Sequence, residues 1–282
     1  MTEVMVAKTA GFCFGVSKAV KMVYDEIDKN SGNVYTYGPI IHNEGVVNDL
    51  ISKGVKVLNS EQELKQLTAG TVIIRSHGVG EKIYKICKEQ KLNIVDATCP
   101  FVKKIHNKVV EQNLLGRRVL VIGNPEHPEV IGIIGWGRPD TQAFENIEEF
   151  LKLKVHMGEK ISIVSQTTYN YIKFKEILDI IRNLGYDITC FNTICNATQD
   201  RQVEARDIAS KVDAMIVIGG KNSSNTRKLY EICKYECKQT IFIQTLDDLN
   251  HEDLISVRNV GITAGASTPK HIIEEVQNNV RS

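Results

Sequence analysis

Three cysteines recur at nearly equal intervals along the 282-residue chain and constrain its fold more than any other feature. Cys13, Cys99 and Cys195 are separated by 86 and 96 residues, and 87 residues follow the last of them. Each cysteine follows a segment with strand character and precedes one with helical character. Strand-to-helix turns at one edge of open α/β sheets are where such folds place their chemistry. The spacing therefore predicts three related α/β modules, each bringing one thiol to a shared site.

The hydrophobic pattern predicts sheets that are mainly parallel. Runs rich in valine and isoleucine alternate with helical patterns, and they lack the strict alternation of a sheet exposed on one face. We expect strands at residues 34–37, 55–58, 72–75, 119–122, 161–165, 214–218, 241–244 and 260–263. We expect modules at residues 14–98, 99–194 and 195–282, related by a pseudo-threefold axis, with residues 1–13 completing the last one.

Composition argues against several classes of partner. The net charge of +1 gives no reason to expect nucleic acid or an anionic membrane surface. No run reaches the 18 apolar residues of a membrane-spanning helix, and the first residues lack the pattern of a signal peptide. We therefore expect a cytoplasmic protein. Seven cysteines in such a chain favour metal binding or catalysis over a disulfide framework.

The positions of the three cysteines favour a metal cluster. A helix N-terminus favours the thiolate form, which is the metal ligand. Isolated cysteines match neither the paired spacing of a zinc finger nor the closely spaced run of a ferredoxin. A cubane cluster held by three distant cysteines would leave one iron open as a Lewis acid. The alternative is that all three thiols are helix caps or packed core residues.

Three histidines also follow predicted strands: His42, His77 and His127. A lone histidine at such a position is usually a structural hydrogen-bonding group, but three of them favour a pocket that binds an anion or moves protons. Glu129, two residues beyond His127, is a candidate proton source beside that pocket. His106 lies in a helical pattern and is assigned no role.

Hydroxyl and amide side chains occupy three further turns that follow buried strands. These turns are Ser165–Thr168, Gly219–Thr226 and Thr263–Pro269. Backbone N–H groups and hydroxyls at such turns can bind phosphate. Together with the histidines, these turns predict a site for a small anionic molecule.

In chain order these motifs resemble one enzyme family, 4-hydroxy-3-methylbut-2-enyl diphosphate reductase, an iron–sulfur enzyme of the non-mevalonate route to isoprenoids. The matching segments are Gly11–Val16, Ile41–Asn43, Arg75–Val79, Asp96–Pro100, His127–Val130, Gln166–Thr168, Cys195–Gln202, Ser223–Thr226 and Ala264–Pro269. They extend over essentially the whole chain, so the resemblance is specific.

The resemblance implies an α/β trefoil around a central 4Fe-4S cluster that is held by Cys13, Cys99 and Cys195 and has one open iron. The ligands that it implies for the substrate diphosphate are His42, His77, His127, Ser223, Ser224, Asn225 and Ser267. It implies that Thr167 orients the substrate hydroxyl, that Glu129 supplies protons, and that His127 belongs with them to the catalytic residues. Members of the family remove the hydroxyl reductively and release isopentenyl and dimethylallyl diphosphate, with electrons from ferredoxin or flavodoxin.

Two other functions remain as alternatives. A hydro-lyase or quinolinate synthase also uses a three-cysteine cluster, without net reduction, but a dicarboxylate substrate would favour an arginine clamp. An iron–sulfur redox sensor would usually carry a basic DNA-binding element, and the sequence shows none. Both are less consistent with the motifs than the reductase.

Overall fold

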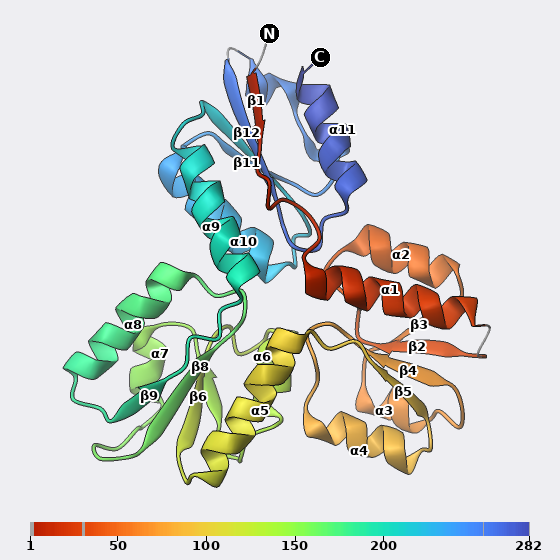
Figure 1. Ribbon diagram of the computed structural model, residues 1–282, viewed down its shortest axis with the longest axis vertical. Coiled ribbons are helices and arrows are strands. Elements are labelled where there is room, and N and C mark those ends of the chain that lie inside the picture. Colours follow the sequence, from red (N-terminus) through yellow and green to blue (C-terminus); the bar gives the residue numbers. More distant parts are fainter. Residues whose placement is uncertain (1–2, 30–31, 256, 282) are drawn as a thin grey trace. The chain divides into compact units, whose positions relative to one another are not determined.

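The computed structural model describes residues 3–29, 32–255 and 257–281. Three separate four-stranded sheets form, and every strand pair within them is parallel (Figure 1). The chain divides into two compact units: residues 1–17, 42–45 and 195–282 form unit 1, and residues 18–41 and 46–194 form unit 2. The three-module division at 14–98, 99–194 and 195–282 stays a prediction.

Unit 2 contains two of the sheets. The strands of the first sheet are β2 (Val34–Tyr37), β3 (Lys56–Leu58), β4 (Thr71–Ile74) and β5 (Asn93–Asp96), in the order β3-β2-β4-β5. The helices near them in sequence are α1 (Phe14–Asp28), α2 (Glu44–Ser52), α3 (Glu61–Lys65) and α4 (Glu81–Glu89). The strands of the second sheet are β6 (Arg118–Ile122), β7 (Gln142–Phe144), β8 (Ile161–Ser165) and β9 (Ile188–Cys190), in the order β7-β6-β8-β9. Its helices are α5 (Pro100–Leu114), α6 (Pro128–Ile134), α7 (Ile147–Lys152) and α8 (Tyr171–Asn183).

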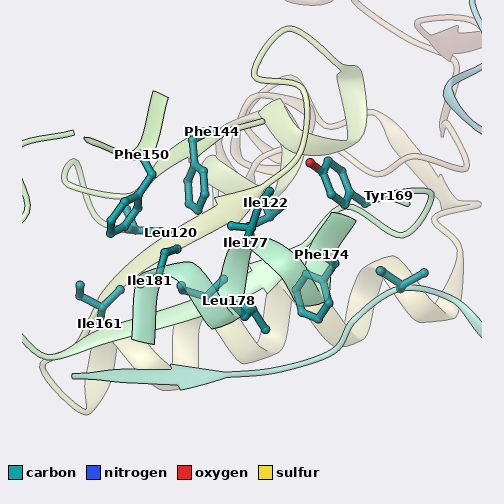
Figure 2. Packing of buried hydrophobic residues seen from close by; sticks show 12 residues of the cluster. Leu120, Ile122, Phe144, Phe150, Ile161, Tyr169, Phe174, Ile177, Leu178 and Ile181 are labelled. Carbon is teal, nitrogen blue, oxygen red and sulfur yellow. The ribbon is translucent and has the colours of Figure 1, made fainter. Parts of the chain in front are cut away.

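The second sheet is buried on both faces, which explains why its strands are continuously apolar. Leu120 and Ile122 of β6 pack with residues of α7 and α8, including Phe150 and Phe174 (Figure 2). The alternate β6 residues Val119 and Val121 pack instead with residues of α5 and α6. Both sets are fully buried, so neither face of this strand tolerates a polar residue.

Unit 1 contains the third sheet and the N-terminal strand. The strands are β1 (Glu3–Val6), β10 (Ala214–Ile218), β11 (Thr240–Ile243) and β12 (Asn259–Ala264), in the order β1-β12-β10-β11. The helices are α9 (Asn196–Ala209), α10 (Ser224–Glu236) and α11 (Lys270–Arg281), with 3₁₀ turns η1 (Leu246–Asp248) and η2 (His251–Leu254). The pairing of Val4 with Val260 joins the two ends of the chain in one sheet.

All three sheets have the same strand order. The first strand of each lies between the second and the third, and the fourth lies at the edge beside the third; in unit 1 that fourth place belongs to β1. The strand order therefore reverses between β2 and β4, between β6 and β8, and between β10 and β12, because the next strands are added on the opposite side of the first strand. Ligands of open α/β sheets bind at the carboxyl ends of strands that flank such a point.

The eight expected strands are present. The structure also forms β1, β5 and β9 in the segments before the three cysteines, where strand character was expected, and it adds β7, which was not expected. All four are edge strands of three or four residues whose side chains are largely exposed or half-buried. Short strands that bury little apolar surface leave a weak periodic signal in the sequence.

Among the described residues, no helix has an apolar stretch long enough to cross a bilayer.

Candidate active site

The side chains singled out in the sequence fall at equivalent places in the three sheets. In each sheet, polar candidates follow the first and third strands, and a cysteine follows the fourth. In the first sheet of unit 2, His42 follows β2, His77 follows β4 and Cys99 follows β5. In the second sheet, His127 follows β6, Thr167 follows β8 and Cys195 follows β9. In unit 1, Ser223–Asn225 follow β10, Ser267 follows β12 and Cys13 follows β1. Three switch points thus carry polar groups of the kind that binds an anion, and three edge strands lead to thiols.

The most constrained acid is Glu129 on the first turn of α6. Its side chain is 2% exposed. One carboxylate oxygen accepts the Thr167 backbone N–H at 2.6 Å, and the other accepts the Thr167 hydroxyl at 2.8 Å. Burial raises the pKa of Glu129 to about 7, while the two hydrogen bonds from Thr167 lower it. The carboxyl group can therefore hold or release a proton near neutral pH.

His127 is the N-cap of α6, and its hydrogen bond defines which ring nitrogen carries the proton. Pro128 occupies the first turn, where its missing N–H costs nothing. The Nδ1 atom of His127 accepts the backbone N–H of Glu129 at 3.1 Å. An accepting Nδ1 carries no proton, so the ring is the neutral tautomer with its proton on Nε2. His127 thus offers one neutral N–H donor.

His77 is held beside His127 by the loop that follows β4. The two ring centroids lie 5.5 Å apart in an edge-to-face arrangement. The Ser76 hydroxyl donates to the carbonyl of Ile40 at 2.9 Å, and the Ser76 carbonyl accepts the Cys99 N–H at 2.9 Å. One residue therefore connects the segment after β2, the His77 loop and the Cys99 turn.

His106 is a functional neighbour that the sequence analysis missed. The ring is 3% exposed, and it stacks on Trp136 at 5.3 Å. A Cβ atom at Gly78, whose φ is +71°, would lie 2.7 Å from His106, so the ring forms the floor of the His77 loop. The Trp136 indole N–H donates to the carbonyl of Val79 at 2.8 Å. Burial lowers the pKa of His106 to about 4, so this support is uncharged at neutral pH.

The pattern of α5 could have suggested that His106 is buried, because it follows Val102 and Ile105 on one helix face. The sequence contains no sign of its stacking partner Trp136, which lies two residues beyond the end of α6. Gly80 and Gly135 allow that approach: a Cβ atom at Gly135 would lie 2.6 Å from the Gly80 Cα.

Unit 1 presents a donor with no partner at its switch point. Asn225 is 5% exposed, and its side-chain NH₂ group meets no acceptor among the described residues. Ser223 caps α10 and accepts the Thr226 N–H at 3.3 Å, which leaves its own proton available for donation. A buried donor without an acceptor is costly, so these groups suit an acceptor-rich ligand such as a phosphate.

Ser267 and His42 are neighbours in unit 1, although 225 residues separate them. The Ser267 hydroxyl donates to the His42 carbonyl at 3.0 Å. The same carbonyl lies against Gly220, where a Cβ atom would approach it to 2.6 Å. The segment that carries His42 is thus fixed between the turns after β10 and β12.

The three cysteines each immediately precede a helix: Cys13 before α1, Cys99 before α5 and Cys195 before α9. All three are half-buried. Neither Cys99 nor Cys195 caps its helix through the side chain. Thiols that lie at helix N-termini without making a cap are suited to bind a metal group.

Comparison with known proteins identifies the family. Residues 4–281 match the family described as LytB protein. The 4-hydroxy-3-methylbut-2-enyl diphosphate reductase of Caldanaerobacter subterraneus subsp. tengcongensis is 44% identical over 281 residues, covering 99% of this chain and 97% of that protein. The enzyme of the same name from Clostridioides difficile is 45% identical over 274 residues, covering 97% of both chains.

Two solved structures agree with this result. The structure of (E)-4-hydroxy-3-methyl-but-2-enyl diphosphate reductase, the terminal enzyme of the non-mevalonate pathway, is 41% identical with a TM-score of 0.70, covering 100% of this chain and 99% of that one. The E-1-hydroxy-2-methyl-but-2-enyl-4-diphosphate reductase of Plasmodium falciparum is 28% identical with a TM-score of 0.95, covering 100% and 88%. The chain therefore belongs to the LytB family of 4-hydroxy-3-methylbut-2-enyl diphosphate reductases and is an oxidoreductase.

Proposed function

We propose that this protein reduces 4-hydroxy-3-methylbut-2-enyl diphosphate to isopentenyl diphosphate and dimethylallyl diphosphate. The observation that carries the proposal is the placement of Glu129: a buried acid whose pKa is about 7, held by Thr167 and adjoining His127. Loss of an allylic hydroxyl as water consumes two electrons and two protons, so the reaction needs an acid that is protonated near neutral pH.

The proposed cofactor is a 4Fe-4S cluster held by Cys13, Cys99 and Cys195. The donor set fits it, because three half-buried thiols lie at helix N-termini, where thiolates are favoured. When bound, such a cluster supplies single electrons and one iron that is open to the substrate. The segments after the edge strands β1, β5 and β9 would each contribute one ligand, so the protein would supply three ligands and one position would stay open for the substrate.

The diphosphate is assigned to uncharged donors. His127 offers its Nε2 proton, Asn225 its buried NH₂ group and Ser223 its hydroxyl. We assign His42, His77, Ser224 and Ser267 to the same role, and the Ser267 hydroxyl would turn from the His42 carbonyl to reach a phosphate oxygen. Uncharged N–H and O–H donors that the fold holds in place can bind an anion even where no cationic side chain pairs with its oxygens.

Glu129 and Thr167 are assigned to proton transfer. The protonated carboxyl group of Glu129 holds the proton that leaves with the substrate oxygen, and the Thr167 hydroxyl orients that oxygen. Because Thr167 contacts both carboxylate oxygens, it also fixes the direction in which the acid can deliver its proton. We further propose a cytoplasmic enzyme that receives electrons from ferredoxin or flavodoxin.

An anaerobic assay tests the function. Protein reconstituted with iron and sulfide is mixed with reduced methyl viologen, and substrate-dependent oxidation is followed together with analysis of the C5 diphosphate products. Oxidation with both products supports the reductase. A cluster that responds to the substrate without viologen oxidation would indicate a non-reducing hydro-lyase, and a cluster that ignores the substrate would indicate a redox sensor.

A further inference from the structure

A buried arginine of α9, the helix that follows Cys195, is hydrogen-bonded to the segments around the Cys13 turn. Arg201 of α9 is 3% exposed. Within the described part of the chain its hydrogen bonds go to backbone carbonyls: Nη1 donates to Ala264 at 2.8 Å, and Nη2 donates to Gly11 at 2.9 Å. A buried guanidinium usually pairs with a carboxylate, because desolvating an uncompensated charge is expensive. Its position therefore calls for another explanation.

The two carbonyls belong to the segments that shape the Cys13 turn. Gly11, with φ of +96°, turns the chain two residues before Cys13. Ala264 ends β12, and two residues later the carbonyl of Ala266 accepts the Cys13 N–H at 3.3 Å. Arg201 thus bridges both sides of the turn from one point on α9.

Glu204, one turn further along α9, holds the preceding part of the same segment. Its carboxylate accepts the backbone N–H groups of Lys8 and Thr9, each at 2.8 Å, and the Thr9 hydroxyl at 2.6 Å. Since Cys195 directly precedes α9, one helix carries Cys195 at its N-terminus and both anchors of the Cys13 segment on its side. The position of Cys13 relative to Cys195 is therefore set by α9.

The groups that favour the charged form of Arg201 belong to α9 and to the two cysteine turns of unit 1. Burial lowers the pKa of the guanidinium, whereas Cys13, Glu204 and Cys195 raise it. Glu204 is already shared among three donors of the Cys13 segment. An arginine stays protonated in proteins, so its positive charge stays bound to the carbonyl two residues before Cys13, on the helix that Cys195 directly precedes.

We propose that Arg201 is a positioning residue that fixes the Cys13 turn on the helix that follows Cys195 and places a buried positive charge beside these two thiolates. The positioning part is independent of the reaction. The charge part rests on the proposed cofactor: a fixed cation favours the reduced, more negative state of a cluster, and its removal makes reduction harder.

Three substitutions separate position from charge. Arg201→Lys keeps the charge but cannot bridge both carbonyls, Arg201→Gln keeps one donor without charge, and Arg201→Met loses both functions. Arg206 provides the control on the same helix, because its side chain is 40% exposed and pairs with Glu236 at 3.2 Å. Arg206→Met is expected to behave as wild type in both measurements below.

The first measurement is amide hydrogen exchange in the cofactor-free protein, read by mass spectrometry on peptides that span residues 7–14 and 262–268. We expect exchange at least tenfold faster in all three Arg201 variants, since each breaks the bridge. Wild-type exchange in Arg201→Lys and Arg201→Gln would overturn the positioning role, even if Arg201→Met fails to fold.

The second measurement is the reduction potential of the reconstituted cluster. Arg201→Gln is expected to lower the equilibrium constant for one-electron reduction about tenfold, which corresponds to about 59 mV, while Arg201→Lys keeps the wild-type value. Equal potentials in Arg201→Gln and wild type would overturn the charge role. If wild-type protein binds no cluster, the proposed function fails instead, and the exchange measurement still decides the positioning role.

Discussion

Replacing Glu129 by glutamine should stabilise the protein and inactivate it at the same time. The wild-type carboxyl group keeps its proton in the folded state up to pH about 7, whereas in the unfolded chain it ionises near its ordinary value of 4.5. The contribution of Glu129 to the free energy of unfolding is therefore fully present below pH 4.5 and is lost progressively as the pH rises toward 7. Above pH 7 the free energy of unfolding stays at this lower value. Glutamine carries no charge, so it avoids this loss.

The structure sets the size of the effect. The difference between 4.5 and about 7 corresponds to about 3 kcal/mol, at 1.36 kcal/mol for each tenfold change in the ionisation constant. The glutamine oxygen can accept the Thr167 N–H, and its NH₂ group can donate to the Thr167 hydroxyl oxygen, because that hydroxyl can rotate. At 2–4 °C per kcal/mol, the midpoint of thermal unfolding should rise by about 6–12 °C at pH 8 and by nearly nothing at pH 4.5.

Turnover should change in the opposite direction. Loss of a positioned acid lowers the rate by about 10²-fold or more, and the wild-type rate itself should fall as the pH rises through about 7. The assays are thermal unfolding of the cofactor-free protein across this pH range and anaerobic viologen oxidation by the reconstituted enzyme.

Glu126→Gln is the matched control, because that side chain is exposed and only three residues away. Equal unfolding midpoints of Glu129→Gln and wild type at pH 8 would refute the electrostatic reasoning, and normal turnover would remove Glu129 from the reaction.

Three further outcomes are expected. Cys13→Ser, Cys99→Ser and Cys195→Ser should each lose bound iron and activity, and an active variant with normal iron content would contradict the ligand assignment. Thr167→Val removes a hydroxyl that lowers the pKa of the buried acid, so the fall in rate with pH should move to higher pH while Thr167→Ser retains the wild-type profile. Ser267→Ala should raise KM for the diphosphate roughly tenfold with little change in kcat, the scale of one hydrogen bond, and an unchanged KM would exclude this contact.

Much of the fold could be predicted because the interiors of the sheets leave a local signal. The β6 residues Val119–Ile122 are apolar at every position, since helices cover both faces of the strand. The edge strand β7 was missed because it buries little. β7 has three residues, and its first, Gln142, is exposed. A strand of that kind exists only because β6 offers it hydrogen-bonding groups, and the sequence of β7 does not contain that information.

The candidate site likewise has features that the sequence could predict and features that it could not. The residue types and their spacing were sufficient to select the cysteines, the histidines and Glu129, because helix starts such as Pro128 and the strands before them are local features. Their sequence could not show that Glu129 is buried against a residue 38 positions away, and the raised pKa depends on that burial.

The sequence alone determined the fold class, the positions of the reactive side chains at strand ends and the family to which the chain belongs. The tertiary structure decided which of those side chains are desolvated and what holds them. Burial keeps His106 uncharged beneath the loop that carries His77, and Arg201 donates a hydrogen bond to the carbonyl of Gly11, 190 residues away in the sequence. Periodicity and capping follow from neighbours along the chain, whereas desolvation and buried hydrogen bonds depend on segments that only folding brings together.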